Sequence, residues 1–145
     1  MKTQNGFTLI ELMMVVAVIA IISVFAFPAY NDYVRRGQLT DGTTALADFR
    51  VRMEQFYQDN RTYAGTQCSG VCGASCTATQ YFNYSCQLNT GRGGGQSYTA
   101  TATGSSGRTP GFVYTMNEQN TRATTSATPW GASSTSANTW VTRKK

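Results

Sequence analysis

The longest apolar run of the chain lies near its N-terminus. Residues 7–27 read FTLIELMMVVAVIAIISVFAF, and Glu11 is the only ionisable side chain among them. As an α-helix this run spans roughly 31 Å at about 1.5 Å per residue, which is enough to cross the hydrocarbon core of a bilayer. The rest of the chain is too polar to cover a helix that is apolar on every side. The pattern therefore predicts a membrane-inserted helix and disfavours a helix buried in a soluble core.

A secretory signal peptide is the other interpretation of an apolar run near an N-terminus, and it matches poorly. Signal peptides have a shorter apolar region, and a small-residue cleavage site follows it. Here the run ends in FAFPAY, and the small residue Gly6 lies before the run. The run is therefore not expected to be a cleaved signal peptide.

A helical pattern resumes after Pro28, although proline lacks an N–H group and should break or kink the helix. Between Arg35 and Thr44 the pattern is weak, and Gly37 and Gly42 lower the helix propensity there. Further on, a one-sided apolar stripe at spacings of three and four is typical of a helix that packs on a sheet. The stripe consists of Leu46, Phe49, Met53 and Phe56. We predict an amphipathic continuation of the helix over residues 28–60.

Alternating apolar and polar residues predict three strands in the second half of the chain, within residues 81–88, 97–103 and 111–117. Their apolar positions are Phe82, Tyr84, Cys86 and Leu88 in the first, Tyr98, Ala100 and Ala102 in the second, and Phe112, Tyr114 and Met116 in the third. The connections TGRGGGQ and GSSGRTP are short and rich in turn residues, which favours an antiparallel meander.

Two segments around these strands lack a clear period. Residues 61–80 predict an irregular loop. Half of residues 121–142 are Ser or Thr, and we expect a looped tail there, anchored by Trp130 and Trp140 and closed by a short strand over residues 139–142. The predicted fold class is α+β, with a long N-terminal helix packed on a C-terminal antiparallel β-meander.

Composition narrows the function classes. The 145 residues suffice for one domain of ordinary size. Histidine is absent, which excludes Ser-His-Asp and Cys-His triads and any histidine-ligated metal. We expect neither an enzyme nor a bound cofactor or metal.

The stretch KTQNGFTLIE, residues 2–11, resembles the processing site of type IV prepilins: a short basic leader, Gly6, Phe7 and then a run with one glutamate that opens the apolar helix. The resemblance implies that a prepilin peptidase cuts between Gly6 and Phe7 and methylates the new Phe7 amine. It implies a leader over residues 1–6, a transmembrane and assembly helix over 7–27, its amphipathic continuation over 28–60 and a β-sheet region over 61–145. This α+β arrangement is also the pilin architecture.

Glu11 requires a partner or a function, because a carboxylate in hydrocarbon costs about 3 kcal/mol on insertion scales. No Lys or Arg lies between Lys2 and Arg35. In the family that the leader resembles, the cation is the Phe7 amine of a neighbouring subunit, which meets this glutamate during assembly. The alternative is a protonated, unpaired Glu11 at the lipid headgroups.

Four cysteines lie within nineteen residues: Cys68, Cys72, Cys76 and Cys86. Four thiolates could hold zinc, but their spacing does not resemble a paired CxxC ribbon. The prepilin resemblance implies export of this region, where disulfides are favoured. Of the three connectivities we favour Cys68 with Cys86 and Cys72 with Cys76.

The phrases YFNYSCQL, SYTATATG, GFVYTMNEQNTRATT and WVTRKK resemble the minor-pilin branch that contains the DNA-uptake receptor. Basic residues in loops suit a nucleic-acid backbone. The candidate DNA contacts are Arg92, Arg108, Arg122, Arg143, Lys144 and Lys145. The alternative is an ordinary solvated surface, and the aromatic residues of the strands fit a sheet core better than a stacking platform.

These resemblances imply a structural subunit of the type IV pilus, a minor pilin, with two alternatives: a receptor pilin that binds extracellular DNA for uptake, and a pseudopilin of a type II secretion system. The implied partners are other pilin subunits, prepilin peptidase, the inner membrane before assembly and, for the receptor, extracellular DNA. The implied location is the inner membrane, crossed once, followed by the extracellular filament.

Overall fold

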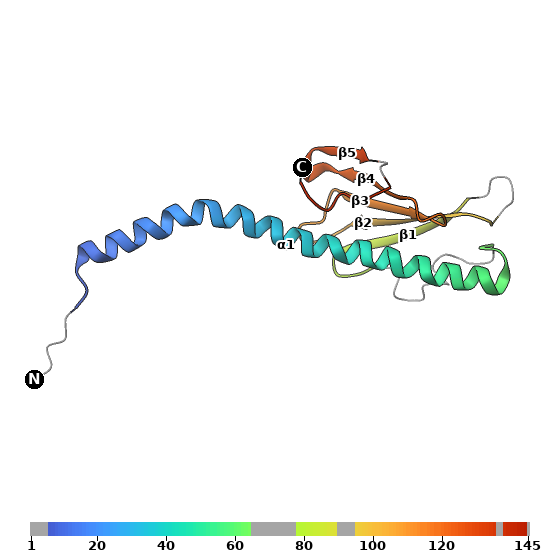
Figure 1. Ribbon diagram of the computed structural model, residues 1–145, viewed down its shortest axis with the longest axis horizontal. Helices are drawn as coiled ribbons and strands as arrows, with labels where there is room; N and C mark the ends of the chain where they lie inside the picture. The colour runs from blue at the N-terminus through green and yellow to red at the C-terminus, as the bar shows by residue number, and fades with distance from the viewer. Residues whose placement is uncertain (1–5, 65–77, 90–94, 136–137, 145) are drawn as a thin grey trace, which may run out of the picture. The chain divides into compact units, whose positions relative to one another are not determined.

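The computed structural model describes residues 6–64, 78–89, 95–135 and 138–144 of the chain, with the side chains of residues 132–135 left aside. These residues belong to two units, Met1–Val34 and Arg35–Lys145, which we call unit 1 and unit 2 and describe separately. Helix α1, Leu9–Asn60, begins in the first unit and ends in the second (Figure 1). Unit 2 also contains strands β1 (Phe82–Leu88), β2 (Tyr98–Gly104), β3 (Phe112–Asn117), β4 (Arg122–Ala127) and β5 (Ala132–Thr135), and the short 3-10 helix η2 (Thr128–Trp130).

The five strands form one antiparallel sheet in the order β1-β2-β3-β4-β5. Phe82 pairs with Gly104 and Leu88 with Tyr98, so the β1–β2 connection lies at one end of the sheet. The β2–β3 connection, residues 105–111, lies at the opposite end because successive strands of a meander reverse direction. The predicted α+β fold and antiparallel meander are confirmed.

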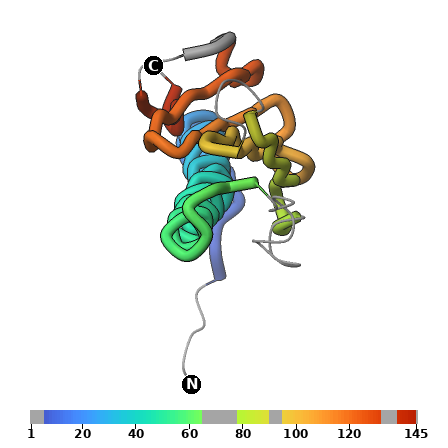
Figure 2. Tube along the Cα trace, turned by 90° about the vertical axis from the view of Figure 1, so that its right-hand side faces the viewer, coloured from blue at the N-terminus to red at the C-terminus, as the bar shows by residue number. Residues whose placement is uncertain are grey.

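The core of unit 2 lies between one face of the sheet and the second half of α1 (Figure 2). The alternation predicted for β2 and β3 is confirmed, since all their predicted apolar positions are buried. On the helix, Leu46, Phe49 and Met53 are buried as the stripe predicts, whereas the fourth position, Phe56, is only partly buried. The stripe also extends back to two positions in the segment where the sequence pattern is weak, Leu39 and Gly42.

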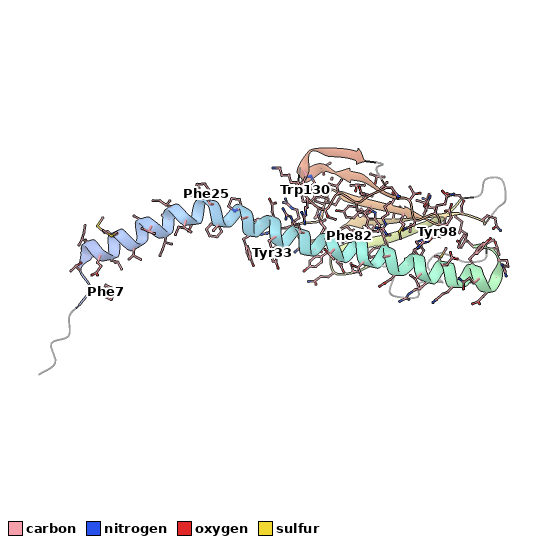
Figure 3. All side chains as sticks on the ribbon, viewed as in Figure 1. Phe7, Phe25, Tyr33, Phe82, Tyr98 and Trp130 are labelled. Atoms are coloured by element: carbon pink, nitrogen blue, oxygen red, sulfur yellow. The ribbon has the colours of Figure 1, made fainter. Side chains whose placement is uncertain are left out.

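Gly42 explains why the weak segment is helical. A Cβ atom at this position would lie 2.9 Å from three ring atoms of Phe82, which is fully buried on β1 (Figure 3). The absence of a side chain at Gly42 therefore lets β1 approach the helix closely. Glycine costs helix propensity, but this contact with the sheet outweighs the local preference.

The helix passes through Pro28 without interruption, so the first of the two expected outcomes, a break, is wrong, and the second, a kink, stays a prediction. Proline removes one backbone hydrogen bond, and the turns on either side keep theirs. The local cost of about 3 kcal/mol does not suffice to end a helix that continues for many turns on both sides of Pro28.

The looped tail predicted over residues 121–142 is wrong in two respects. It contains strands β4 and β5, and residues 139–142 form no strand. The inward positions of β4 are Thr124 and Ala127, which are buried but too small and polar to show an apolar alternation in the sequence. Threonine nevertheless favours strands because it is β-branched.

Side-chain hydrogen bonds hold residues 139–142 on the sheet. The Tyr114 hydroxyl donates to the Val141 carbonyl at 2.9 Å, and the Val141 N–H donates to Oγ1 of Thr124 at 2.9 Å. Nε1 of Trp140 donates to the Thr115 carbonyl at 3.1 Å. The anchoring role expected of Trp140 is therefore seen, through contacts with β3 and β4 rather than through an added strand.

Candidate functional site

The N-terminal end of α1 is capped by the side chains of Thr8 and Glu11, each of which bonds to the other residue's N–H group. The Thr8 carbonyl accepts the first helical bond, from the Leu12 N–H, at 3.2 Å. The Glu11 N–H donates to Oγ1 of Thr8 at 3.3 Å, while Oε2 of Glu11 accepts from the Thr8 N–H at 3.5 Å and from its hydroxyl at 3.4 Å. This is a capping box, in which two N–H groups that a helix start leaves unbonded are satisfied by side chains. Its signal in the sequence, Thr-x-x-Glu before an apolar run, was missed.

The apolar side chains of unit 1 lie on the surface. Among the described residues, α1 is the one helix long and apolar enough to span a membrane, and none of its most apolar window is buried. Figure 3 shows Phe7 and Phe25 projecting from this segment, and they are 88% and 75% exposed. A continuous apolar surface of this length is not found on soluble monomers. It requires a lipid or protein environment that unit 1 alone does not supply.

The junction predicted for cleavage is accessible. Gly6 and Phe7 precede the first helical residue, Leu9, and both are exposed. No heavy atom of another residue lies within 4 Å of a Cβ built at Gly6. An exposed, non-helical segment is what a peptidase active site can bind.

The disulfide prediction lies largely outside the described residues. Cys86, half-buried on β1, is disulfide-bonded. Cys68, Cys72 and Cys76 fall within residues 65–77, of which the structure gives no description. The proposed connectivity therefore stays a prediction.

The structure distributes the candidate basic residues over two ends of unit 2. Arg108 lies in the β2–β3 connection, where its N–H donates to Oε1 of Gln38 at 2.8 Å. Arg122 begins β4 at the opposite end. The two ends are separated by strands of up to seven residues, roughly 20 Å at about 3.3 Å per residue. Arg143 and Lys144 are exposed, and Arg92 and Lys145 lie outside the described residues.

Arg122 is held in place by three neighbours. Its guanidinium carbon lies 4.9 Å from the centre of the Trp140 ring, and its Nε donates to Oδ1 of Asn120 at 3.3 Å. Its backbone N–H donates to Oδ1 of Asn138 at 2.9 Å. A guanidinium stacked on an aromatic ring and fixed at Nε presents its outer edge in one orientation, which suits bidentate contact with a phosphate or a guanine edge.

The strand aromatics serve the core, as the sequence favoured. Phe82, Tyr98 and Tyr114 are buried, and Tyr84 is partly buried against them. Desolvation raises the pKa of Tyr84 to about 12 and raises the pKa of Tyr98 and of Tyr114. These rings are therefore neutral structural groups rather than a platform on which bases stack.

Comparison with known proteins gives two family matches. Residues 28–111, more than half of the chain, match the family described as "Type IV minor pilin ComP, DNA uptake sequence receptor". Residues 1–27 match the "Prokaryotic N-terminal methylation motif".

Curated fimbrial proteins are also similar to part of the chain. A "Type IV major fimbrial protein FimA" from Dichelobacter nodosus (strain VCS1703A) is 46% identical over 71 residues, which are 48% of this chain and 44% of that protein. A "Fimbrial protein" from Dichelobacter nodosus is 46% identical over 72 residues, 48% of this chain and 45% of that protein. The chain thus spans less than half the length of these relatives.

Proposed function

The chain belongs to the type IV minor pilin family, and from this premise we propose that it is a minor subunit of a type IV pilus, matured at Gly6 and Phe7 and assembled through its N-terminal helix. The observation that carries the proposal is the fully exposed apolar surface of residues 7–27, interrupted by one carboxylate in the first turn. A span in lipid and a bundle of like helices both cover such a surface. The match to fimbrial proteins favours the pilus over a type II pseudopilin.

The location of Glu11 supports a role in selecting the neighbour. Transfer from lipid to a bundle exchanges one apolar environment for another, so packing and polar contacts must drive assembly. Cleavage after Gly6 would create a Phe7 amine next to the capping residue Thr8. A cation at a helix N-terminus is unfavourable there, whereas a carboxylate in the first turn is favourable. A Glu11 carboxylate that meets the Phe7 amine of a neighbouring subunit satisfies both charges in an apolar surrounding.

Glu11 has two candidate roles, capping the helix and pairing its charge with a neighbouring subunit. Two variants separate these roles. Glu11→Gln keeps a capping side chain at the third helical position but removes the charge, because Gln also completes a capping box. Thr8→Val keeps the Glu11 charge but removes the Oγ1 acceptor of the cap, at a cost of about 1 kcal/mol. Each variant is expressed beside the wild-type chain, and sheared filaments are quantified by mass spectrometry. Only chains whose mass shows maturation at Phe7 are counted.

If the charge selects the neighbour, Glu11→Gln should reduce incorporation by at least about tenfold, equivalent to roughly 1.4 kcal/mol, while Thr8→Val stays within about twofold. Equal losses in both variants would assign Glu11 to helix capping alone. Normal incorporation of Glu11→Gln would contradict the pairing.

A second candidate function, capture of extracellular DNA, is favoured by the family match over residues 28–111 and by the fixed Arg122. Phosphate contacts would make the affinity for duplex DNA fall steeply with salt, because bound phosphates release counterions. The full chain in detergent is titrated by gel shift at two salt concentrations with unrelated competitor DNA.

Because the β2–β3 and β3–β4 connections lie at opposite ends of unit 2, single substitutions can test DNA binding at each end separately. Arg122→Gln and Arg108→Gln each change one end, and Arg52→Gln on the exposed helix surface is the matched control. Loss of binding in Arg122→Gln alone would assign the contact to the β3–β4 end. No binding at low salt would leave the chain as a filament subunit only.

A further inference from the structure

Basic side chains gather at the end of unit 2 where its first residue lies. Arg35 opens this unit, and Arg36 is exposed beside it. One helical turn further on, Gln38 accepts a hydrogen bond from the Arg108 N–H, which brings the β2–β3 connection to the same end. The Gly107 position confirms the contact, since a Cβ there would lie 2.9 Å from Oε1 of Gln38.

The C-terminal segment adds two more cations to this end. Asn138 lies beside Arg122, the first residue of β4, and Val141 lies beside Thr124, two residues further along the strand. The segment therefore runs parallel to β4, toward the end of the sheet where β4 finishes, and Figure 1 shows the dark-red segment ending there. Arg143 and Lys144 follow and are exposed. We call Arg35, Arg36, Arg108, Arg143 and Lys144 the basic end.

Three carboxylates of unit 2 lie at the end of the sheet opposite to the basic end. Glu54 and Asp59 lie in the last two turns of α1, and Glu118 lies in the β3–β4 turn, where its Oε2 accepts from the Tyr98 N–H at 3.3 Å. All three belong to the opposite end of the sheet. Asp41 is the carboxylate of unit 2 nearest in sequence to Arg36, and it is half-buried and accepts the Thr79 hydroxyl. The opposite end also carries the cations Arg61 and Arg122, so its charges are mixed, whereas cations outnumber carboxylates at the basic end. Asp32, four residues before Arg36, belongs to unit 1.

The basic end is the end of unit 2 to which the N-terminal segment is covalently joined. Arg35 directly follows Val34, so this is the end at which the N-terminal segment is attached. If residues 7–27 occupy the hydrocarbon, Arg36 lies nine residues beyond it, about 13 Å along a helix. The headgroup layer takes up about 5–8 Å of that distance. The remainder is within the Debye length of about 8 Å at physiological ionic strength.

We propose that the basic end docks on the anionic phospholipid headgroups of the membrane that holds the N-terminal helix. The inference rests on the proposed membrane insertion and adds a second, electrostatic contact between unit 2 and the lipid surface. Each basic residue close to an anionic surface increases the docked population by about fivefold. Substitution of the exposed Arg36, Arg143 and Lys144 should therefore lower the docked population measurably.

Duplex DNA also presents negatively charged phosphates. The location of the basic end in unit 2 indicates which of the two partners, lipid or DNA, it fits. The basic end contains Arg35, which directly follows the unit that holds the proposed membrane segment, whereas the β3–β4 end, which we call the outer end, lies at the other end of the strands. The fixed Arg122 lies at that outer end. The lipid surface is therefore the partner that fits the basic end.

The test uses the full chain reconstituted in vesicles, with its own tryptophans as reporters. Trp130 follows the end of β4 and packs on Phe112 at 4.8 Å between ring centres, so it lies at the basic end. Lipids with a nitroxide on the headgroup quench a tryptophan close to the surface. Quenching is compared in vesicles of phosphatidylcholine alone and in vesicles of phosphatidylcholine mixed with anionic phosphatidylglycerol. Flotation in both vesicles establishes insertion.

We expect phosphatidylglycerol to increase quenching several-fold at low salt. High salt should remove this increase, because it screens the charges. Arg143→Gln/Lys144→Gln should reduce the docked-to-undocked ratio about 25-fold. The matched control Arg52→Gln/Arg61→Asn removes two exposed charges elsewhere and should retain the increase; Asn tolerates the positive φ of 58° at Arg61.

Three results would overturn the inference. Equal quenching in the two vesicles, with flotation intact, rejects docking and leaves membrane insertion standing. An equal loss in the control variant shows that net charge alone matters. Loss of duplex DNA binding in Arg143→Gln/Lys144→Gln with unchanged lipid quenching assigns the basic end to DNA. Failure of flotation, by contrast, rejects the proposed function itself.

Discussion

Gly42 provides the sharpest test of how α1 packs on the sheet. Alanine at an exposed helix position normally stabilises a protein relative to glycine by roughly 0.5–1 kcal/mol. At position 42 the added Cβ would lie 2.9 Å from Cδ2, Cε2 and Cζ of Phe82, well inside the optimal carbon–carbon separation of about 3.5–4.0 Å. The sign of the effect depends on whether the Phe82 ring can retreat.

The surroundings of Phe82 oppose such a movement. Its side chain is fully buried, and its ring lies 6.0 Å from the Tyr114 ring and 6.5 Å from the Tyr84 ring, measured between centres. Overpacking of a closed core costs typically about 1–3 kcal/mol. After subtracting the gain in helix propensity, we expect Gly42→Ala to destabilise unit 2 by up to about 2.5 kcal/mol.

Gly37 is the matched control, because it lies in the same helix and a Cβ there meets nothing within 4 Å. Gly37→Ala should therefore stabilise the protein by roughly 0.5–1 kcal/mol. Unfolding of the full chain in detergent is followed in urea by tryptophan fluorescence. A Gly42→Ala variant that is stabilised as much as Gly37→Ala would refute the close approach. In a Phe82→Leu background the cost of Gly42→Ala should shrink, with a coupling of about 0.5–3 kcal/mol.

Three further predictions concern maturation, the cysteines and pH. The mature chain should begin with N-methylated Phe7, and intact-mass analysis of filaments that shows an uncut Met1 would contradict it. All four cysteines should be oxidised in the exported chain, so alkylation without reduction should add no mass, and chains with free thiols would show otherwise. Because burial raises the pKa of Tyr84 to about 12 and also that of Tyr98 and Tyr114, the unfolded chain releases protons more readily above pH 10. The free energy of unfolding should therefore fall between about pH 10 and 12, with no contribution from these groups at lower pH, and an unfolding series across that range tests this.

Apolar periodicity predicted the parts of the fold that use large side chains. The stripe on α1 and the alternation in β2 and β3 were recognisable because Leu46, Phe49, Tyr98 and Tyr114 are large and buried. Strand β4 was missed for the opposite reason. Its buried positions are Thr124 and Ala127, and Oγ1 of Thr124 accepts a hydrogen bond from the Val141 N–H of the tail. A local pattern cannot show that Val141, distant in sequence, supplies the partner.

The candidate sites were predicted unevenly for a similar physical reason. Glu11 was identified because a charge in an apolar run is locally anomalous, and the Thr8 cap lay in the same four residues. Arg108 and Arg122 were grouped by charge alone, although they lie at opposite ends of the sheet. Which basic residues share a surface depends on the order of the strands and on the course of the C-terminal segment, and both are tertiary properties.

The meander itself separates the two basic surfaces for which we propose a lipid contact and a DNA contact. Consecutive connections of an antiparallel sheet alternate between its ends, so Arg108 joins the end where α1 enters unit 2, and Arg122 occupies the other. A substitution in one connection therefore changes only one surface, since the ends lie roughly 20 Å apart, about two Debye lengths or more at physiological salt. A subunit whose basic end lies on lipid keeps the guanidinium of Arg122, stacked on Trp140, available on the outer end. Membrane docking and capture of an external polyanion are thus compatible in one chain and separable by single substitutions.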